Sequence, residues 1–430
     1  MLKNNPMRVW MVTIGEPLPT DGRNERLLRT GILAEQLSNA GHGVHWWTSS
    51  FDHARKRQRT SCDARVTIND GYEISLLTAN RYSRNISLHR IANHRTLARK
   101  FGLLAQREPS PDIIICSWPL IELCAEAVRF GNSRGVPVVL DFRDMWPDAI
   151  VDLAPRMMRP VVKIALHHSY RNATFAASHA TAITGITENI VDWGVQFSGR
   201  QRNSADRAFP MGYKSRSLTA DSLEEASRFW RNQGLATDGS EFVVCFFGTI
   251  GRHFEIETVA EAAEKLTRSG RAIKFVLCGD GPQLSQWKRL SAKSPNVIFP
   301  GWVDAAKIQT LMRLSSAGLA PYYSSWDFRL SIPNKPIEYL SAGLPVVSSL
   351  RGVLADLLRE NHCGLTYRNS DSDGLVRALS DSYDDRALCT EMAGNADRLF
   401  RRRFTAEAVY SEMQDYLVGI ATDSRRKQAA

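Results

Sequence analysis

The sequence predicts an α/β fold with two doubly wound, Rossmann-like domains that face a cleft. Short apolar segments alternate with helical patterns along most of the chain. Residues 198–241 interrupt this alternation with polar, charged and glycine-containing sequence, and the rhythm then restarts. Several strand segments, such as 112–116, are apolar without alternation, which is typical of parallel strands covered on both faces. Ligands of such sheets bind outside the carboxyl ends of the strands, so we expect the active site there.

The elements are expected in the following order. Strands are predicted at 8–14, 41–49, 72–77, 112–116, 136–141, 180–185, 242–247, 274–278, 296–300, 317–322, 346–349 and 363–368. Helices are predicted before residue 41 and at 86–105, 119–134, 148–179, 255–269, 282–291, 304–314, 333–342 and 406–419, with two more after residue 368. Segment 52–66 is expected to be a surface loop and residues after 419 an unpatterned basic tail. The domains would then be 1–205 with the helix 405–420 packed back on it, a linker at 206–240, and 241–404.

Charge and composition bound the partners. The 430 residues carry a formal charge of +10, and by count residues 1–210 hold 27 Lys/Arg against 19 Asp/Glu. A basic half attracts nucleic acid, anionic lipid or phosphorylated substrates. No nucleic-acid fold signature accompanies it, so we expect an anionic acceptor or a membrane surface and no nucleic acid. A basic face that only keeps the protein soluble is the alternative.

The compartment is predicted from absences. No run of 18 apolar residues occurs, and the apolar N-terminal segment suits a first strand rather than a signal peptide. The seven cysteines form no CxxC pair, which favours reduced thiols. We therefore expect a cytoplasmic protein, peripheral at most on the inner face of the plasma membrane.

The stretch 331–349 (SIPNKPIEYLSAGLPVVSS) has the strongest local pattern. Prolines suit the first turn of a helix, and Gly343 suits its end. Asn334 and Lys335 would lie at the helix N-terminus, where free N–H groups and the dipole favour an anion. Glu338 lies one turn further, where a carboxylate can accept hydrogen bonds from sugar hydroxyls. The alternative is a helix–turn–strand unit with a surface Lys and Glu.

Two glycine loops follow strands of the second domain. Gly248 and Gly251 allow the backbone to approach a phosphate, and Arg252 can bind that phosphate through two N–H groups. Gly279 and Gly281, in a GDG turn, could carry nucleotide contacts. Ordinary glycine turns with a surface arginine remain the alternative for both loops.

One loop of the first domain carries acids and an arginine. After the strand at 136–141 comes FRDMWPD, in which Arg143 and Asp144 can bind sugar hydroxyls or accept a proton. A salt-bridged structural loop is the alternative. Gly15, after the first strand, is expected to line the cleft. His167 and His168 have no third ligand at metal spacing, so no metal is predicted.

These motifs together resemble a bacterial glycosyltransferase of the GT-B fold, family 4 type. The matches, in family order, are the first-strand glycine loop, LxxAGHxV, FRDMWPD, FFGTIGR, LCGDGP and PNKPIEYLSAGLPVVSS, and they span nearly the whole chain. The resemblance implies retaining transfer, of the hexosyltransferase type, from a nucleotide-diphosphate sugar without a protein-bound metal or other cofactor. The acceptor would be a glycan or a polyprenyl-linked sugar in lipopolysaccharide, capsule or exopolysaccharide synthesis.

The resemblance also implies roles for the residues. The second domain would bind the donor through Gly248, Gly251, Gly279, Gly281, Asn334 and the catalytic Arg252, Lys335 and Glu338. The first would bind the acceptor through Gly15, Arg143 and the catalytic Asp144.

The chain departs from the family pattern at two points. Leu330 stands where many relatives carry the first of two acidic residues, and the second basic residue expected after FFG has no counterpart. Two other functions therefore stay open. One is a nucleotide-sugar 2-epimerase of the same architecture, and the other is a non-catalytic partner subunit.

Overall fold

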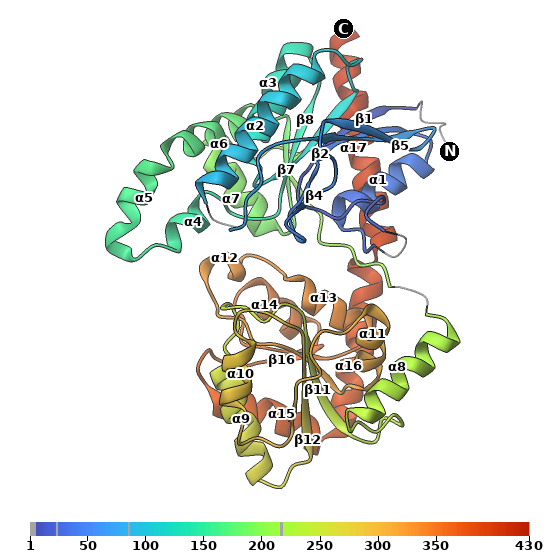
Figure 1. Ribbon diagram of the computed structural model, residues 1–430, viewed down its shortest axis with the longest axis vertical. Coiled ribbons are helices and arrows are strands. Elements are labelled where there is room, and N and C mark those ends of the chain that lie inside the picture. Colours follow the sequence, from blue (N-terminus) through green and yellow to red (C-terminus); the bar gives the residue numbers. More distant parts are fainter. Residues whose placement is uncertain (1–5, 23–24, 85–86, 216–217, 430) are drawn as a thin grey trace. The chain divides into compact units, whose positions relative to one another are not determined.

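The computed structural model describes residues 6–22, 25–84, 87–215 and 218–429. The chain divides into two compact units: Met1–Gly212 with Ala406–Ala430 is unit 1, and Tyr213–Thr405 is unit 2. Each unit is built on one open sheet with helices around it (Figure 1). Both sheets are largely parallel, which confirms the predicted α/β class.

Unit 1 contains an eight-stranded sheet in the order β10-β9-β8-β7-β1-β2-β6-β5. All neighbours are parallel except β5, which runs antiparallel to β6. The strands are β1 (Arg8–Val12), β2 (Gly43–Ser49), β5 (Ala64–Asn69), β6 (Tyr72–Leu77), β7 (Ile113–Trp118), β8 (Val138–Phe142), β9 (Ala182–Gly185) and β10 (Arg207–Ala208). A separate short pair is formed by β3 (Phe51–Asp52) and β4 (Arg57–Gln58).

Helices cover both faces of this sheet. They are α1 (Arg29–Asn39), α2 (Leu88–Ala105), α3 (Ile121–Arg134), α4 (Asp148–Asp152), the 3-10 turn η1 (Arg156–Met158), α5 (Arg159–Ala165), α6 (His167–His179), α7 (Glu188–Ser198) and α17 (Ala406–Ala429). One face packs on α1 and α17, in a core that includes Met11, Leu37 and Met413. On the other face, Trp10 stacks on Phe130 of α3 at 5.1 Å between ring centroids.

Unit 2 contains a six-stranded, all-parallel sheet in the order β13-β12-β11-β14-β15-β16. Its strands are β11 (Phe242–Phe247), β12 (Ile273–Cys278), β13 (Val297–Ile298), β14 (Ala317–Ala320), β15 (Val346–Ser348) and β16 (Gly364–Thr366). Its helices are α8 (Ala220–Asn232), α9 (Ile256–Arg268), α10 (Leu284–Leu290), α11 (Ala305–Leu314), α12 (Trp326–Arg329), α13 (Asn334–Ser341), α14 (Val353–Glu360), α15 (Ser372–Asp384) and α16 (Arg386–Arg403).

The structure differs from the expected elements in four places. Residues 52–66 are not one loop, because β3, β4 and the start of β5 lie there. The region 206–240, expected as a linker, contains β10 and α8, and α8 packs on α11 through a hydrogen bond from Trp230 Nε1 to the Lys307 carbonyl at 2.9 Å. Helix α14 lies in a segment for which no element was predicted. The basic tail is helical, since α17 continues to Ala429.

Each difference has a local reason. β5 is an edge strand whose side chains are exposed at every second position, so its sequence is polar. In α17 the C-terminal turns consist of good helix formers, and Arg425 pairs with Asp112 of the same unit. Among the described residues, no helix combines the length and the apolar character needed to cross a bilayer.

Candidate active site

The strand order of unit 2 defines where a ligand would bind. From β11 the chain adds β12 and β13 on one side and then crosses back to add β14, β15 and β16 on the other. The direction of winding therefore reverses between β11 and β14. In open parallel sheets the loops at the carboxyl ends of such strands separate and leave a crevice for the ligand. The loops that begin at Gly248 and Gly279 and the helix α13 all lie at this edge of the sheet.

Glycines bring the two loops after β11 and β12 into direct contact. Gly279 has φ +136°, and a Cβ there would lie 1.9 Å from the Gly248 carbonyl oxygen. Gly281 has φ +152°, and a Cβ there would lie 2.5 Å from the Ile250 carbonyl oxygen. Hydrogen bonds join the loops, from Gly248 N to Cys278 O at 3.1 Å and from Ile250 N to Asp280 O at 2.9 Å. The glycines are required for this close approach of two backbones, whether or not a ligand is bound.

Lys335 reaches from α13 to the same place. A Cβ on Gly248 would lie 2.7 Å from Lys335 Nζ. The ammonium group lies over the rings of Phe246 and Phe254, 5.3 and 5.0 Å from their centroids. Its side chain forms no hydrogen bond or ion pair with any other described residue. Burial lowers the pKa of Lys335, and the carboxylate of Glu338 opposes that shift. A half-buried ammonium group with no ion-pair partner among the described residues is suited to binding a negatively charged ligand.

Helix α13 starts as predicted, with Pro333 as N-cap and an exposed Asn334 in its first turn. Glu338, one turn later, is 8 % exposed. Burial and the Glu338 charge together raise the pKa of the neighbouring Tyr322 hydroxyl. The structure therefore brings Asn334, Lys335 and Glu338 to one helix at the carboxyl edge of the sheet.

The turn Gly251–His253 is more open. Arg252 is exposed, and its guanidinium makes no hydrogen bond or ion pair with a described residue. The His253 ring lies against Gly251, where a Cβ would be 2.9 Å from Nε2. Burial and the nearby charge of Lys335 lower the pKa of His253. Arg252 is thus available to a ligand but is not held in place by any contact.

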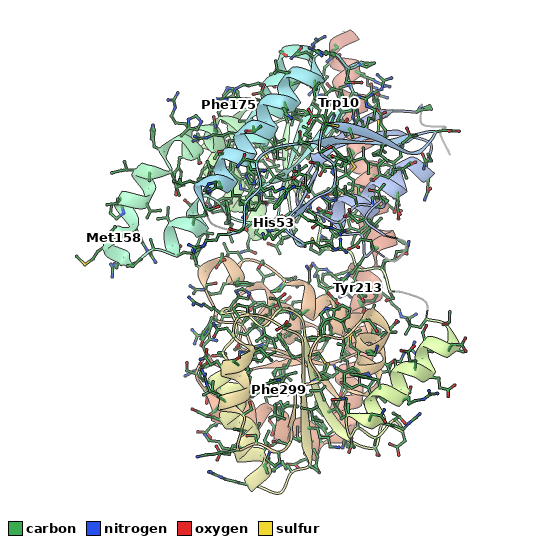
Figure 2. The ribbon with its side chains drawn as sticks, in the orientation of Figure 1. Trp10, His53, Met158, Phe175, Tyr213 and Phe299 are labelled. Atoms are coloured by element: carbon green, nitrogen blue, oxygen red, sulfur yellow. The ribbon has the colours of Figure 1, made fainter. Side chains whose placement is uncertain are left out.

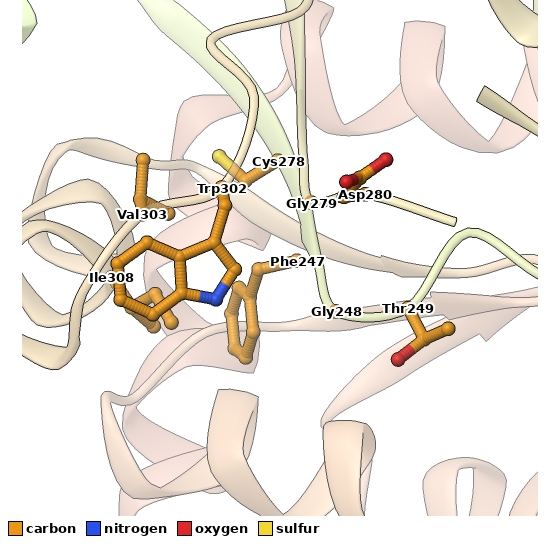
Figure 3. Close-up of a pocket in the computed structure, with 9 residues that line it drawn as sticks. All are labelled: Phe247, Gly248, Thr249, Cys278, Gly279, Asp280, Trp302, Val303 and Ile308. Atoms are coloured by element: carbon orange, nitrogen blue, oxygen red, sulfur yellow. The ribbon is translucent and has the colours of Figure 1, made fainter. Parts of the chain in front are cut away.

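A pocket of about 330 Å³ opens beside the two glycine loops (Figure 3). Its lining residues are Phe247, Gly248, Thr249, Cys278, Gly279, Asp280, Trp302, Val303 and Ile308. The indole of Trp302 is 76 % exposed and lies next to Phe247 and Ile308. Trp302 was not predicted as a site residue, because a single exposed aromatic residue after a strand carries no sequence signal. A flat, exposed ring beside a glycine loop is suited to stacking on a planar ligand group.

A second pocket, of about 480 Å³, lies at the opposite edge of the same sheet. It is lined by Phe242 and Ile273, the first residues of β11 and β12, and by Tyr383 and Arg386. None of the predicted site residues lines it. Of the predicted donor residues, Gly248 and Gly279 line the pocket at the carboxyl edge.

In unit 1, Arg143 belongs to a buried ion-pair network. Its Nε donates to Asp141 Oδ2 at 2.7 Å, its Nη1 pairs with Glu16, and its Nη2 donates to Thr30 Oγ1 at 3.0 Å. Arg29 donates two hydrogen bonds of 2.9 Å to the same Asp141. Burial alone would raise the pKa of Asp141, but the charges of Arg29 and Arg143 hold it well below its usual value. Arg143 is thus committed to internal carboxylates, as in the structural alternative for this loop.

Asp144 and Gly15 lie near a cationic and aromatic cluster. The backbone N–H of Met145 donates to Asp144 Oδ1 at 2.7 Å, and the Asp144 charge acts on Arg90. His53 lies 3.7 Å from the Cβ position of Gly15 and hydrogen-bonds the Tyr82 hydroxyl at 2.7 Å. Lys56 lies over the same tyrosine ring at 5.1 Å.

The charges of this cluster act on one another. Burial, followed by the charges of Lys56 and Arg90, lowers the pKa of His53 to about 4. The sequence does not reveal that Lys56 and Arg90, which lie in separate segments, come together next to Gly15.

Comparisons with known proteins agree with this geometry. Residues 241–385 match the family described as glycosyl transferases group 1. Alpha-D-kanosaminyltransferase from Streptomyces kanamyceticus is 24 % identical over 294 residues, which cover 66 % of this chain and 70 % of that protein.

Two solved structures share the fold. Sucrose-phosphate synthase from Thermosynechococcus elongatus has a TM-score of 0.70 at 15 % identity, covering 95 % of this chain and 98 % of its own. HepE from Anabaena, solved with UDP and glucose, has a TM-score of 0.66 at 15 % identity, covering 96 % and 100 %.

The fold is that of GT-B glycosyltransferases, and the domain in unit 2 that matches the family identifies the chain as a glycosyltransferase. The match to glycosyl transferases group 1 covers residues 241–385, as the motifs of this part of the chain predict.

Proposed function

We propose that the protein transfers a sugar, with retention of configuration, from a nucleotide-diphosphate sugar to a glycan or polyprenyl-linked acceptor. Unit 2 would hold the donor and unit 1 the acceptor. The observation that carries the proposal is the Lys335 ammonium, which lies over two aromatic rings, next to the glycine loops, and has no ion-pair partner among the described residues. The UDP-containing HepE structure, which shares the fold, supports a nucleotide donor.

The donor would lie along the carboxyl edge of the unit 2 sheet. Its diphosphate would meet Lys335, the N–H groups of the Gly248 loop and the first turn of α13 at Asn334. The exposed Arg252 would close over the phosphates from the other side. Trp302 would stack on the nucleobase in the neighbouring pocket, and Glu338 would accept hydrogen bonds from the ribose hydroxyls. These roles use the charge and the exposure of each group as the structure has them.

The chemical work of this site would be electrostatic. As the bond between the sugar and the diphosphate breaks, positive charge develops on the sugar ring and negative charge on the leaving phosphate. Lys335 and Arg252 stabilise the phosphate charge in the transition state more than in the bound donor. A fixed donor of this kind typically contributes a few kcal/mol to catalysis. The half-buried position of Lys335 strengthens its effect, since less water screens it.

The acceptor end would use the cluster near Gly15. Asp144 would orient the acceptor hydroxyl, whereas Arg143 would hold the loop through its bonds to Asp141 and Glu16. Lys56 and Arg90 give this part of unit 1 a positive potential, which suits a phosphate-containing acceptor such as a polyprenyl-diphosphate sugar. Together with the resemblance of FRDMWPD to enzymes of surface polysaccharide synthesis, this supports a role in lipopolysaccharide, capsule or exopolysaccharide assembly at the cytoplasmic face of a membrane.

A turnover assay with a panel of nucleotide sugars tests the proposal. Purified full-length protein is incubated with each donor, with and without a polyprenyl-diphosphate sugar acceptor. We expect nucleotide release that depends on the acceptor, and a product whose anomeric configuration matches that of the donor. Interconversion of donor sugars without an acceptor would instead indicate an epimerase. Donor binding without turnover on any acceptor would indicate a non-catalytic partner subunit.

A further inference from the structure

A helical segment of unit 1 exposes several large apolar side chains to solvent. It comprises α4, η1 and α5, residues 148–165, and is called the α5 projection below. No residue of these three elements is buried. Figure 1 shows α4 and α5 extending from the rest of unit 1 at the left of the view. The exposed large apolar residues of the segment are Leu153, Met157, Met158, Val161 and Ile164.

The apolar residues form the outer end of the projection. Met157 is 91 %, Ile164 75 % and Leu153 71 % exposed. Figure 2 shows Met158 at the tip, with its side chain directed away from unit 1. Several large apolar side chains that are exposed within one short helical segment indicate an interaction site.

Cationic side chains surround this apolar surface. No acidic residue occurs from Leu153 to Thr187, whereas Arg156, Arg159, Lys163 and Arg171 all lie within this range. Arg156 and Arg171 form no hydrogen bond or ion pair with another described residue. Arg159 pairs with Asp152, and the Lys163 ammonium lies over the Tyr170 ring at 5.5 Å. Apolar side chains at the tip with cations around them are the composition of a surface that binds anionic lipid.

The base of the projection is held firmly. Asp148 accepts hydrogen bonds from the Tyr170 hydroxyl at 2.7 Å and from Trp193 Nε1 at 3.3 Å. Phe197 stacks on Tyr170 at 6.1 Å. The tip therefore does not fold back to hide its apolar residues, because its root is fixed by a polar and aromatic contact set.

We propose that the α5 projection inserts into the headgroup and upper acyl region of an anionic bilayer. Leu153, Met157, Val161 and Ile164 would leave water for the acyl boundary, and Arg156 and Lys163 would meet lipid phosphates. The purpose of this insertion rests on the proposed function, because insertion would bring unit 1 to a lipid-linked acceptor. Binding to the bilayer itself depends only on the exposed residues and charges described here.

The charge pattern favours a bilayer over a protein partner. A protein interface of this kind would require a matching acidic and apolar surface, whereas an anionic leaflet supplies both over its whole area. The basic groups of α2 and the segment 55–59 would add attraction at longer range. Insertion of apolar side chains adds a component that salt does not weaken, which separates this surface from a purely electrostatic contact.

Vesicle flotation with the full-length protein tests the proposal. Phosphatidylcholine vesicles are compared with vesicles that contain about 30 mol% phosphatidylglycerol. We expect Met157→Ser/Ile164→Ser to lower the partition coefficient for anionic vesicles at least tenfold. The matched control Leu88→Ser/Leu103→Ser removes two equally exposed apolar residues from α2 and should leave partitioning unchanged. Arg156→Gln/Lys163→Gln should lower binding at low salt only.

A polarity-sensitive dye locates the contact. Met157→Cys, in a Cys62→Ser background that removes the exposed thiol, carries the dye at the tip. We expect its emission to shift to the blue with anionic vesicles, while the same dye at Leu103→Cys stays unchanged. Vesicle binding with the tip dye still in water would overturn the proposal. Equal flotation of Met157→Ser/Ile164→Ser and the parent would also overturn the proposal. So would a parent that never floats but forms a dimer, measured by light scattering, that Met157→Ser/Ile164→Ser does not form.

Nucleotide binding separates this proposal from the proposed function. Calorimetry with UDP and GDP should give the same affinity for the parent and for Met157→Ser/Ile164→Ser, because the donor residues lie in unit 2. If neither protein binds any nucleotide while the dye enters the bilayer, the assignment of the donor site is wrong, but the α5 projection still binds the membrane as proposed.

Discussion

The charged side chains at the carboxyl edges of the two sheets differ in whether they pair with one another. In unit 1, Arg29, Arg143, Asp141 and Glu16 neutralise one another in a buried network. In unit 2, Lys335 lies at the equivalent edge without any carboxylate bound to it, and Arg252 is exposed to solvent. Similar topology thus supports one edge whose charges pair with one another and one that, under our proposal, binds an anionic ligand. The difference shows that the position of a loop on the fold does not by itself make its charged residues functional.

The same difference predicts opposite results from removing a cation. In unit 1 the loss of an arginine leaves a buried carboxylate without compensation, so folding should suffer. In unit 2 the loss of Lys335 removes a desolvated charge that has no ion-pair partner among the described residues, so folding should be spared and activity should suffer. The four predictions below test this contrast.

The largest effect is expected for Arg29→Met. It leaves Asp141 buried with one cation in place of two, and breaking a buried pair typically costs 3–5 kcal/mol. We expect the free energy of unfolding of unit 1 to fall by about 3–5 kcal/mol, measured by urea denaturation. Arg55→Met is the matched control, because Arg55 also pairs with two carboxylates, Asp52 and Glu25, but its own side chain is 41 % exposed. A loss as small as that of the control would contradict the network's structural role.

Lys335→Ala and Arg252→Ala should each lower turnover at least tenfold, which corresponds to about 1.4 kcal/mol of transition-state stabilisation. Stability in urea should stay the same, because neither side chain has an ion-pair partner to lose. Lys265→Ala serves as control, since Lys265 pairs with Asp373 on the surface of unit 2. Full activity of both variants would remove the phosphate assignment.

Gly279→Ala tests the contact between the glycine loops. Its Cβ would meet the Gly248 carbonyl oxygen, so one loop must move and the pocket must change shape. We expect about tenfold weaker nucleotide binding by calorimetry, close to 1.4 kcal/mol. Gly270→Ala has the same kind of positive φ, at +74°, but nothing within 4 Å of its Cβ. It should show only the backbone cost of roughly 1 kcal/mol in stability, with nucleotide affinity unchanged.

The smallest effect is expected for Glu338→Gln, which keeps the shape of the side chain but removes its charge. A charge-assisted hydrogen bond to a ribose hydroxyl becomes a neutral one, so nucleotide affinity should fall by about threefold to tenfold. A 2′,3′-dideoxynucleotide sharpens the result, because it lacks the hydroxyls. Parent and variant should bind the dideoxynucleotide equally well; an unchanged ratio between the two proteins would place the contact elsewhere on the donor.

Much of the carboxyl edge of the unit 2 sheet could be predicted, because the sequence patterns of its loops and of α13 are local. The apolar run of β11 followed by Gly248, and the Pro333–Gly343 pattern of α13, each lie within a few residues of sequence. The partners of Arg143 could not be predicted, since Glu16 lies 127 residues away in the chain. Sequence analysis therefore offered acceptor binding and a salt-bridged loop as alternatives, and only the fold shows which charges meet.

The solvent exposure of apolar side chains was a second property that the sequence could not predict. The region 148–179 was predicted to be helical, and it is, with short breaks. Its sequence does not reveal that Met157 and Ile164 face solvent, because the same apolar residues could pack on a neighbouring helix. Trp302 poses the same problem in the donor pocket. For α8, the interruption of the strand–helix alternation at 198–241 concealed a helix that packs on α11 in unit 2.

Helix α17 has a consequence for how the protein is made. It follows unit 2 in the chain, yet Tyr410, Met413 and Leu417 form part of the unit 1 core with residues of β1 and α1. Unit 2 is complete once Thr405 has left the ribosome, and its two ends are already joined there by a hydrogen bond from Tyr213 N to Phe404 O at 2.8 Å. Unit 2 therefore has everything it needs to fold during translation. Unit 1, although begun first, keeps part of one face of its sheet uncovered until α17 has emerged from the ribosome, and nascent chains would need chaperone protection on that part.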